Sequence, residues 1–179
     1  DSRVDYSLLL PVFCLLVIGV VAIYIAVSHD YPNNVLPILG QQIAWISLGL
    51  VIGFVVMFFN TEFLWKVTPY LYGLGLALMI LPLVFYNPNL VASTGAKNWV
   101  SIGGTTLFQP SEFMKISYIL MLARAIVRFT QKHKEWRRTI PLDFLLIGWM
   151  IAFTIPVLIL LALQSDLGNA LVFVAIFSG

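Results

Sequence analysis

Five long runs of mainly apolar residues constrain this chain more than any other feature of its sequence. A helix needs about 20 such residues to cross the hydrocarbon core of a bilayer. The runs are solid, unlike the roughly ten-residue segments of alternating polarity in a membrane β-barrel. The sequence therefore predicts an all-α, polytopic transmembrane protein with spans at residues 8–27, 43–59, 67–86, 113–129 and 144–163, and an incomplete sixth at 167–179.

The composition excludes several classes of soluble protein. Hydrophobic residues make up 60% of the 179 positions and charged residues only 10%, whereas a soluble domain carries roughly 25% charged residues. Too few polar side chains are present to cover a surface in water, which excludes a soluble enzyme and a disordered chain. A net charge of +2 cannot form a nucleic-acid-binding face, and one cysteine with two histidines predicts no Cys- or His-rich metal cluster.

The two ends of the chain predict that it is a piece of a longer protein. The chain begins at Asp1 rather than at a methionine, and the sixth run stops at Gly179 before it is long enough to span a membrane. We therefore expect residues 1–179 to be the N-terminal part of a single integral membrane domain.

The basic residues predict how the chain is oriented, because cytoplasmic loops carry an excess of lysine and arginine. If the five runs alternate across the bilayer, eight basic residues at or between the runs share one side, and only Lys97 lies in a loop on the other. We therefore expect a cytoplasmic N-terminus and external residues 92–108. The eight residues are Arg3, Lys66, Arg124, Arg128, Lys132, Lys134, Arg137 and Arg138.

The basic stretch at residues 132–138 has two interpretations. It could fix the topology alone, or it could also bind lipid or a partner, because basic clusters beside a transmembrane helix attract anionic lipid.

Glu112 and Lys115 are the first candidate functional residues, because a charge inside the membrane costs about 2.5–3.5 kcal/mol at a helix centre. They are three residues apart and therefore neighbours on one helix face. Pro110 suits the first position of a helix, and an acidic residue in the first turn complements the helix dipole. Helix entry thus explains Glu112 but not Lys115, and both interpretations stay open.

Asp166 is the third candidate, and it too has a structural alternative. Ser165 or Asp166 would suit the N-cap of the sixth helix. A simple hairpin would not need the whole polar cluster of Gln164, Ser165, Asp166 and Asn169. The longest external connection, residues 87–111, contains Lys97 and Trp99, and its Gly103-Gly104 pair predicts a hairpin turn.

Three motifs occur in a fixed order among these runs: Gly95-Ala96-x-x-Trp99, then Gln109-Pro110-Ser111-Glu112-x-x-Lys115, then Gln164-Ser165-Asp166-Leu167-Gly168. In them the chain resembles the SEDS family of shape, elongation, division and sporulation proteins, which includes RodA and FtsW. Family members have about ten spans, so the resemblance covers roughly their N-terminal half. Ser165 stands where the family usually has proline, which we expect to be a mild change. The stretch from Asp5 to Leu10 resembles RodA more than FtsW.

The resemblance implies a peptidoglycan glycosyltransferase that polymerises lipid II at the outer face of the bacterial cytoplasmic membrane, in cell-shape control or cell division. It implies as partners lipid II, a class B penicillin-binding protein that supplies the transpeptidase, and other elongation or division proteins, but no nucleic acid. The family's proposed catalytic aspartate lies in an outer loop after the seventh helix. We therefore expect no catalytic residue within residues 1–179 and no activity from this piece alone.

The expected contribution of this chain is a wall of the substrate cavity. Lys115 could contact the diphosphate or keep Glu112 ionised. Glu112 and Asp166 could orient sugar hydroxyls, assist proton transfer or hold a divalent cation such as Mg²⁺ or Mn²⁺. The expected cavity residues are Lys97, Trp99, Gln109, Ser111, Glu112, Lys115, Gln164 and Asp166.

Two other functions compete with a polymerase. A lipid II flippase would also use intramembrane charges and interrupted helices, but its polar residues should continue inward, and residues 116–123 offer only Ser117 and Tyr118. A scaffold that recruits a transpeptidase would need no buried Lys–Glu pair.

Overall fold

The structure is a computed structural model that describes residues 6–103, 105–132 and 140–179. Arg3, Gly104 and most of the basic stretch, residues 133–138, lie outside the described residues, so the predictions that concern them stay predictions. The chain divides into two compact units, residues 1–61 and 62–179, and each is described by itself.

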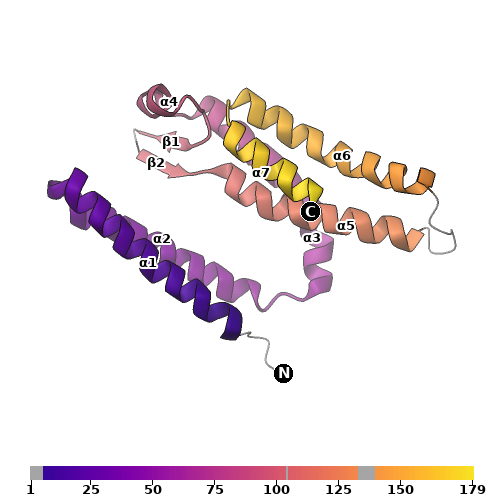
Figure 1. Ribbon diagram of the computed structural model, residues 1–179, viewed down its shortest axis with the longest axis horizontal. Coiled ribbons are helices and arrows are strands. Elements are labelled where there is room, and N and C mark those ends of the chain that lie inside the picture. The colour runs from indigo at the N-terminus through magenta and orange to yellow at the C-terminus, as the bar shows by residue number, and fades with distance from the viewer. Residues whose placement is uncertain (1–5, 104, 133–139) are drawn as a thin grey trace. The chain divides into compact units, whose positions relative to one another are not determined.

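The first unit is a helical hairpin. Helix α1 (Tyr6–Asp30) is joined to α2 (Val35–Val56) by the short 3-10 turn η1 (Pro32–Asn34) (Figure 1). The turn is closed by the Asn34 amide, which donates to the Tyr31 carbonyl at 2.9 Å. Most apolar side chains of both helices are exposed, as expected of surfaces that face lipid rather than water.

The second unit is built from four main helices, with a small insertion between two of them. The main helices are α3 (Thr61–Val84), α5 (Pro110–Lys132), α6 (Ile140–Leu163) and α7 (Leu167–Ser178). Between α3 and α5 lie the short helix α4 (Pro88–Thr94) and the strands β1 (Val100–Ile102) and β2 (Thr105–Phe108). Figure 1 shows the strands at the end of the unit where α5 begins.

The buried core of this unit lies where α3, α5, α6 and α7 meet. Hydroxyl groups in it are paired: Tyr72 donates to the Phe153 carbonyl at 2.6 Å, and Tyr118 and Thr154 bond at 2.6 Å. These bonds tie α6 to α3 and to α5. The core cluster consists of Tyr72, Met79, Met114, Tyr118, Leu122, Val157, Leu161 and Phe173.

Four helical segments are long and apolar enough to cross a membrane: Leu9–Asp30, Pro32–Val56, Thr61–Val84 and Asp143–Leu163. The protein is therefore a multi-pass helical membrane protein. The expected span at residues 113–129 is a helix, α5, but it is not among these four because Lys115, Arg124 and Arg128 interrupt its apolar character. The expected count of five full spans is thus not confirmed. Helix α7 is apolar but has only 12 residues.

The small hairpin is the one described departure from an all-helical chain. Strands β1 and β2 pair antiparallel, with Ile102 opposite Thr105. Gly103 occupies the turn with a φ of 60°, a backbone conformation that glycine adopts without steric cost. The hairpin expected around this glycine is therefore present.

Candidate functional site

Asp166 lies at the sharp corner between α6 and α7. The Ser165 amide donates to the Ala162 carbonyl and the Asp166 amide donates to the Leu161 carbonyl, both at 3.0 Å. This pair of bonds is the Schellman motif that ends many helices, and its reversing residue is usually glycine. Ser165 takes that position here with a φ of 59°. Because a proline ring fixes φ near −65°, this corner could not accept proline unchanged, so the serine is more than the mild change expected.

The two carboxylate oxygens of Asp166 have different partners. Oδ1 accepts the backbone N–H of Asn169 at 3.1 Å, which makes Asp166 the N-cap of α7. Oδ2 accepts side-chain amide groups from Asn98 at 2.8 Å, from Asn169 at 2.8 Å and from Gln109 at 3.4 Å. We call Asn98, Gln109, Asp166 and Asn169 the carboxylate–amide cluster. It joins the loop before β1, the residue before α5 and the start of α7.

The carboxylate–amide cluster keeps Asp166 ionised although its side chain is nearly buried. Burial alone would raise the pKa of Asp166, but the hydrogen bonds from Asn169, Asn98 and Gln109 outweigh it and hold the pKa below its ordinary value of 3.8. Donors that point at a carboxylate stabilise its charged form. The chain thus holds a negative charge where α6 ends and α7 begins.

Neighbouring predicted residues extend this site. Ser111, in the first turn of α5, is buried and accepts the Asn169 side-chain amide at 3.2 Å. Gln164 is also buried; its side chain donates to the Met79 carbonyl, and its own carbonyl accepts the Lys97 amide at 2.8 Å. Gln164 therefore anchors the loop and α3 to the end of α6, and its predicted place in the substrate cavity stays a prediction.

The side chains of Lys97 and Trp99 lie toward the periphery. The Lys97 ammonium group sits 4.5 Å from the centroid of the Tyr86 ring, a cation–π geometry. Trp99 is 37% exposed. The structure thus brings the Lys97 backbone to the site but directs its charge to an aromatic ring.

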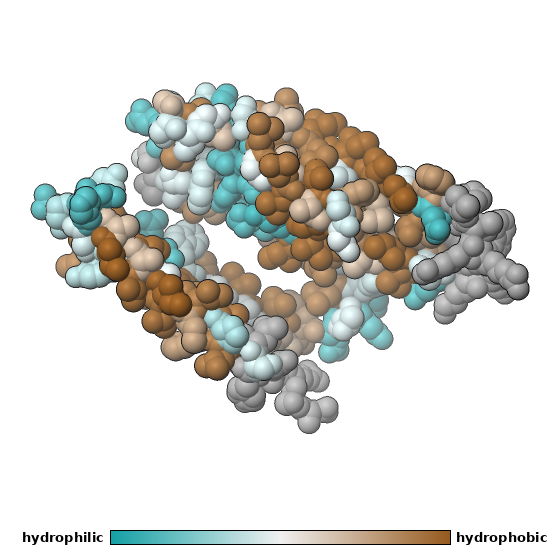
Figure 2. Space-filling view, in the orientation of Figure 1, coloured by the Kyte–Doolittle hydropathy of each residue, from teal (hydrophilic) through white to brown (hydrophobic). Residues whose placement is uncertain are grey.

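Glu112 and Lys115 form an ion pair with an Nζ–Oε1 distance of 2.8 Å, as their spacing predicted. The Glu112 side chain is 60% exposed and that of Lys115 is 23% exposed. On α5 the pair follows Ser111 directly, so one turn contributes a buried hydroxyl to the Asp166 region and an accessible carboxylate beside it. Figure 2 shows hydrophilic side chains gathered where the hairpin meets the start of α5.

Asn98 is not among the cavity residues that the sequence predicts. It lies between two that are, Lys97 and Trp99, and its contact with Asp166 spans 68 positions. Its Oδ1 atom is buried and has no hydrogen-bond partner among the residues that the structure describes. An unsatisfied buried acceptor is rare in proteins and calls for a ligand or water that donates to it.

The surroundings of Asp166 do not suit a divalent cation. Metal ions of this kind need oxygen ligands, whereas three amide groups present N–H donors to Oδ2. Within the described ranges, no three His, Cys, Asp or Glu side chains come together. The expected cation stays a prediction that the geometry around Asp166 does not support.

Comparison with known proteins identifies relatives of the whole chain. A family model described as "Cell cycle protein", which covers FtsW, RodA and SpoVE, matches residues 6–179. The peptidoglycan glycosyltransferase RodA of Treponema pallidum (strain Nichols) is 30% identical over 176 residues, and the match covers 98% of this chain and 37% of the relative. A probable peptidoglycan glycosyltransferase FtsW of Nitrosomonas europaea is 28% identical, and that match covers 98% of this chain and 44% of the relative.

A solved structure has the same fold over this region. The structure is of a peptidoglycan synthase complex that coordinates polymerization and crosslinking. One of its chains is 29% identical to this chain with a TM-score of 0.66, and the match covers 95% of this chain and 44% of the solved one. This chain therefore spans about two-fifths of the length of these three proteins.

Proposed function

The chain belongs to the FtsW, RodA and SpoVE family of cell cycle proteins, and from that membership we propose that the protein polymerises lipid II into glycan strands. The reaction would take place at the outer face of the bacterial cytoplasmic membrane. Residues 1–179 would form one wall of the substrate cavity, and a group outside these residues would deprotonate the acceptor hydroxyl.

The carboxylate–amide cluster is the observation that carries this proposal beyond family membership. It fixes a nearly buried negative charge at the end of three helices, beside the accessible Glu112–Lys115 pair. Sugar hydroxyls need both hydrogen-bond donors and acceptors, and the cluster contains both amide donors and a carboxylate acceptor.

The chemistry assigns different roles to the two charges of the Glu112–Lys115 pair. Transfer of a glycosyl group from a lipid diphosphate leaves a diphosphate, whose charge a positioned cation can stabilise. Lys115 is suited to that contact, and Glu112 holds its ammonium group in place at 2.8 Å. Glu112 is thus proposed as a positioning residue and Asp166 as the fixed anchor of the wall.

The family relationship also supports a proposal about partners and orientation. The solved relative belongs to a synthase complex in which polymerization and crosslinking are coordinated. We propose a class B penicillin-binding protein as the transpeptidase partner, together with other elongation or division proteins.

The proposed cytoplasmic N-terminus would put the carboxylate–amide cluster at the outer face of the membrane. The relatives include both RodA and FtsW proteins, so the suggested greater likeness to RodA stays a prediction.

The buried polar groups of α5 favour a polymerase over a lipid II carrier. Ser117 donates to the Met114 carbonyl, and Tyr118 bonds with Thr154. Both side chains are buried and paired within the protein, so they offer no continuous polar path toward the opposite face.

Incubation of the intact protein with lipid II, alone and with its transpeptidase, tests the proposal. We expect glycan strands from the intact protein. A purified piece limited to residues 1–179 should give none above the background of the transpeptidase alone. Absence of strands from a folded, intact protein with its partner would contradict the proposed reaction. Strands from residues 1–179 would contradict the division of roles.

A further inference from the structure

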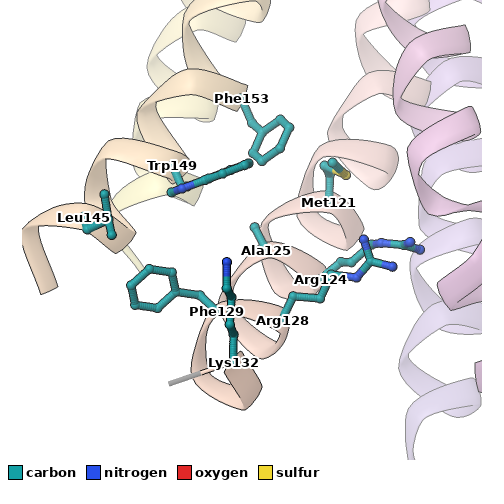
Figure 3. Close-up of a pocket in the computed structure, with 9 residues that line it drawn as sticks. All are labelled: Met121, Arg124, Ala125, Arg128, Phe129, Lys132, Leu145, Trp149 and Phe153. Carbon is teal, nitrogen blue, oxygen red and sulfur yellow. The ribbon is translucent and has the colours of Figure 1, made fainter. Parts of the chain in front are cut away.

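The two ends of α5 differ in how their polar side chains are arranged. At the C-terminal end, the Arg124 and Arg128 side chains leave α5 on the side away from Trp149, although all three line one cavity of about 330 Å³ (Figure 3). The cations and the rings therefore do not converge on one ligand there. At the other end, side chains from the loop before β1, from the residue before α5 and from α7 do converge, on Asp166.

Asn169 is the member of the carboxylate–amide cluster that reaches both Asp166 and α5. Its side-chain nitrogen lies 2.8 Å from Asp166 Oδ2 and 3.2 Å from the Ser111 hydroxyl oxygen. An asparagine amide carries two hydrogens, so it can donate to both oxygens at once. The Asn169 backbone N–H is itself bonded to Asp166 Oδ1 at 3.1 Å, so the backbone that carries this side chain is held in place.

The same carboxylate oxygen thus holds the start of α5 at two positions. The Gln109 side chain donates to Asp166 Oδ2 directly, at 3.4 Å. The Ser111 hydroxyl is held through Asn169, by two shorter bonds, and Ser111 is buried, which limits competition from water. The Glu112 N–H in turn donates to the Gln109 carbonyl at 3.1 Å. Loss of these links should allow the first turn of α5 to move.

The Glu112–Lys115 ion pair projects from this first turn. The two residues are neighbours on α5 and bond at 2.8 Å, so a shift of the turn would move both charges together. Position matters for such groups, because a misplacement of about 1 Å can lower a rate roughly 10²-fold. The place of the Lys115 ammonium group therefore depends on what holds Ser111.

We propose that Asn169 is a positioning residue of the polymerase, which sets the place of the Lys115 ammonium group by holding the first turn of α5 against Asp166. This role rests on the proposed function, because the place of the ammonium group matters only if it contacts the diphosphate. Asn169 acts through Ser111 and does not need to touch the substrate.

Hydrogen exchange of the backbone amides at residues 112–117, measured by mass spectrometry on the intact protein, tests the link without any substrate. Asn169→Ala should raise exchange there about fivefold, the factor expected for the loss of one hydrogen bond. Asn98→Ala is the matched comparison, because it removes a bond of the same 2.8 Å length from the same carboxylate oxygen but not the bond to Ser111. Equal exchange in the two variants would overturn the link through Asn169.

Glycan synthesis by the same variants, with rates expressed per folded protein, tests the role in the reaction. Asn169→Ala should lower kcat about tenfold, less than the cost of a full 1 Å misplacement. The KM for lipid II should stay near the parent value, because the lost interaction belongs to the transition state. A fault in folding alone would lower the amount of folded protein but not this rate. The double variant with Ser111→Ala should be no slower than the slower single variant.

Each contrary outcome identifies the step that fails. An unchanged kcat in Asn169→Ala would overturn the positioning role while the parent still makes strands. Independent losses in the double variant would overturn the path through Ser111. Absence of strands from the parent would overturn the proposed function, and the exchange measurement would still decide the link. Asn89→Ala, which removes an exposed asparagine of α4, should match the parent in exchange and in rate.

Discussion

At the residue scale, the structure confirms that Asp166 caps α7 and gives its second carboxylate oxygen partners that the sequence did not predict, while its role in the substrate cavity stays a prediction. One carboxylate oxygen caps α7 and the other gathers three side-chain amides. The cap could be predicted because it depends on local spacing. The amides could not, because Asn98 and Gln109 are brought to Asp166 from 68 and 57 positions away, and sequence alone does not fix such distances.

Asp166→Asn should remove the negative charge at this position but keep the helix cap. Asparagine caps helices as well as aspartate does, but its amide nitrogen cannot accept bonds from three amide groups. We expect the free energy of unfolding at neutral pH to fall by about 1–3 kcal/mol, the cost of leaving buried donors unsatisfied. Chemical unfolding of both proteins in detergent measures this difference. A variant as stable as the parent would contradict the described hydrogen bonds.

The same pair of proteins makes a prediction about pH. The pKa of Asp166 in the folded protein lies below its ordinary value of 3.8. Its stabilising contribution is therefore fully present above that value and is lost as the pH falls through the folded-state pKa. The stability difference between the parent and Asp166→Asn should be constant from pH 7 to about pH 5 and should shrink in stronger acid. A difference that grows with acid would reverse the sign and exclude this assignment.

Ser165 gives a second prediction at this scale. It adopts a φ of 59° at the corner between α6 and α7, where a side chain costs roughly 1–2 kcal/mol. Ser165→Gly should raise the free energy of unfolding by about 1 kcal/mol. Ser165→Pro should lower it, because the ring cannot take this φ and the bond to the Ala162 carbonyl is lost. Thermal unfolding in detergent tests both, and a stabilising proline would show that the corner is built differently.

At the scale of elements, the apolar runs predicted the helices but not their ends. The run at residues 67–86 corresponds to α3 (Thr61–Val84), and the run at 144–163 to α6 (Ile140–Leu163). Helices extend past the apolar runs because Glu62 and Asp143 in their first turns complement the helix dipole. Helix α4 was not predicted: its seven residues are too few for a periodic pattern, although Asn87 and Pro88 are a cap and first-turn pair.

The contact between α3 and α5 depends on Gly75, and Gly73 in the same helix provides a control. A Cβ atom on Gly75 would lie 2.5 Å from the Met114 sulfur and 3.0 Å from the Ser117 hydroxyl, whereas one on Gly73 would meet nothing within 4 Å. Gly75→Ala should lower the free energy of unfolding by about 1–3 kcal/mol through overpacking. Gly73→Ala should raise it by up to about 1 kcal/mol through helix propensity. Equal effects at the two positions would contradict this packing.

At the scale of the whole molecule, the membrane class follows from composition, but the orientation rests on the distribution of basic residues. Single cysteines at Ser93 and Thr130, in a background where Cys14 is replaced, test that orientation in intact cells. Both positions are exposed. A reagent that cannot cross the membrane should label position 93 and not position 130. The reverse pattern would place the carboxylate–amide cluster inside the cell and remove the case for an external polymerase.

Glycan synthesis by the intact protein carrying Glu112→Gln tests the central claim most directly. The exposed pair with Lys115 stabilises the fold by at most about 1 kcal/mol, so the variant should fold. If Glu112 holds Lys115 for the diphosphate, the rate should fall by a factor on the order of 10²–10³, the range for losing one group that stabilises the charge of the transition state. Lys66→Gln, an exposed charge elsewhere, should keep the parent rate. A stable Glu112→Gln protein with a near-normal rate would contradict the account and leave Glu112 as a helix-entry residue.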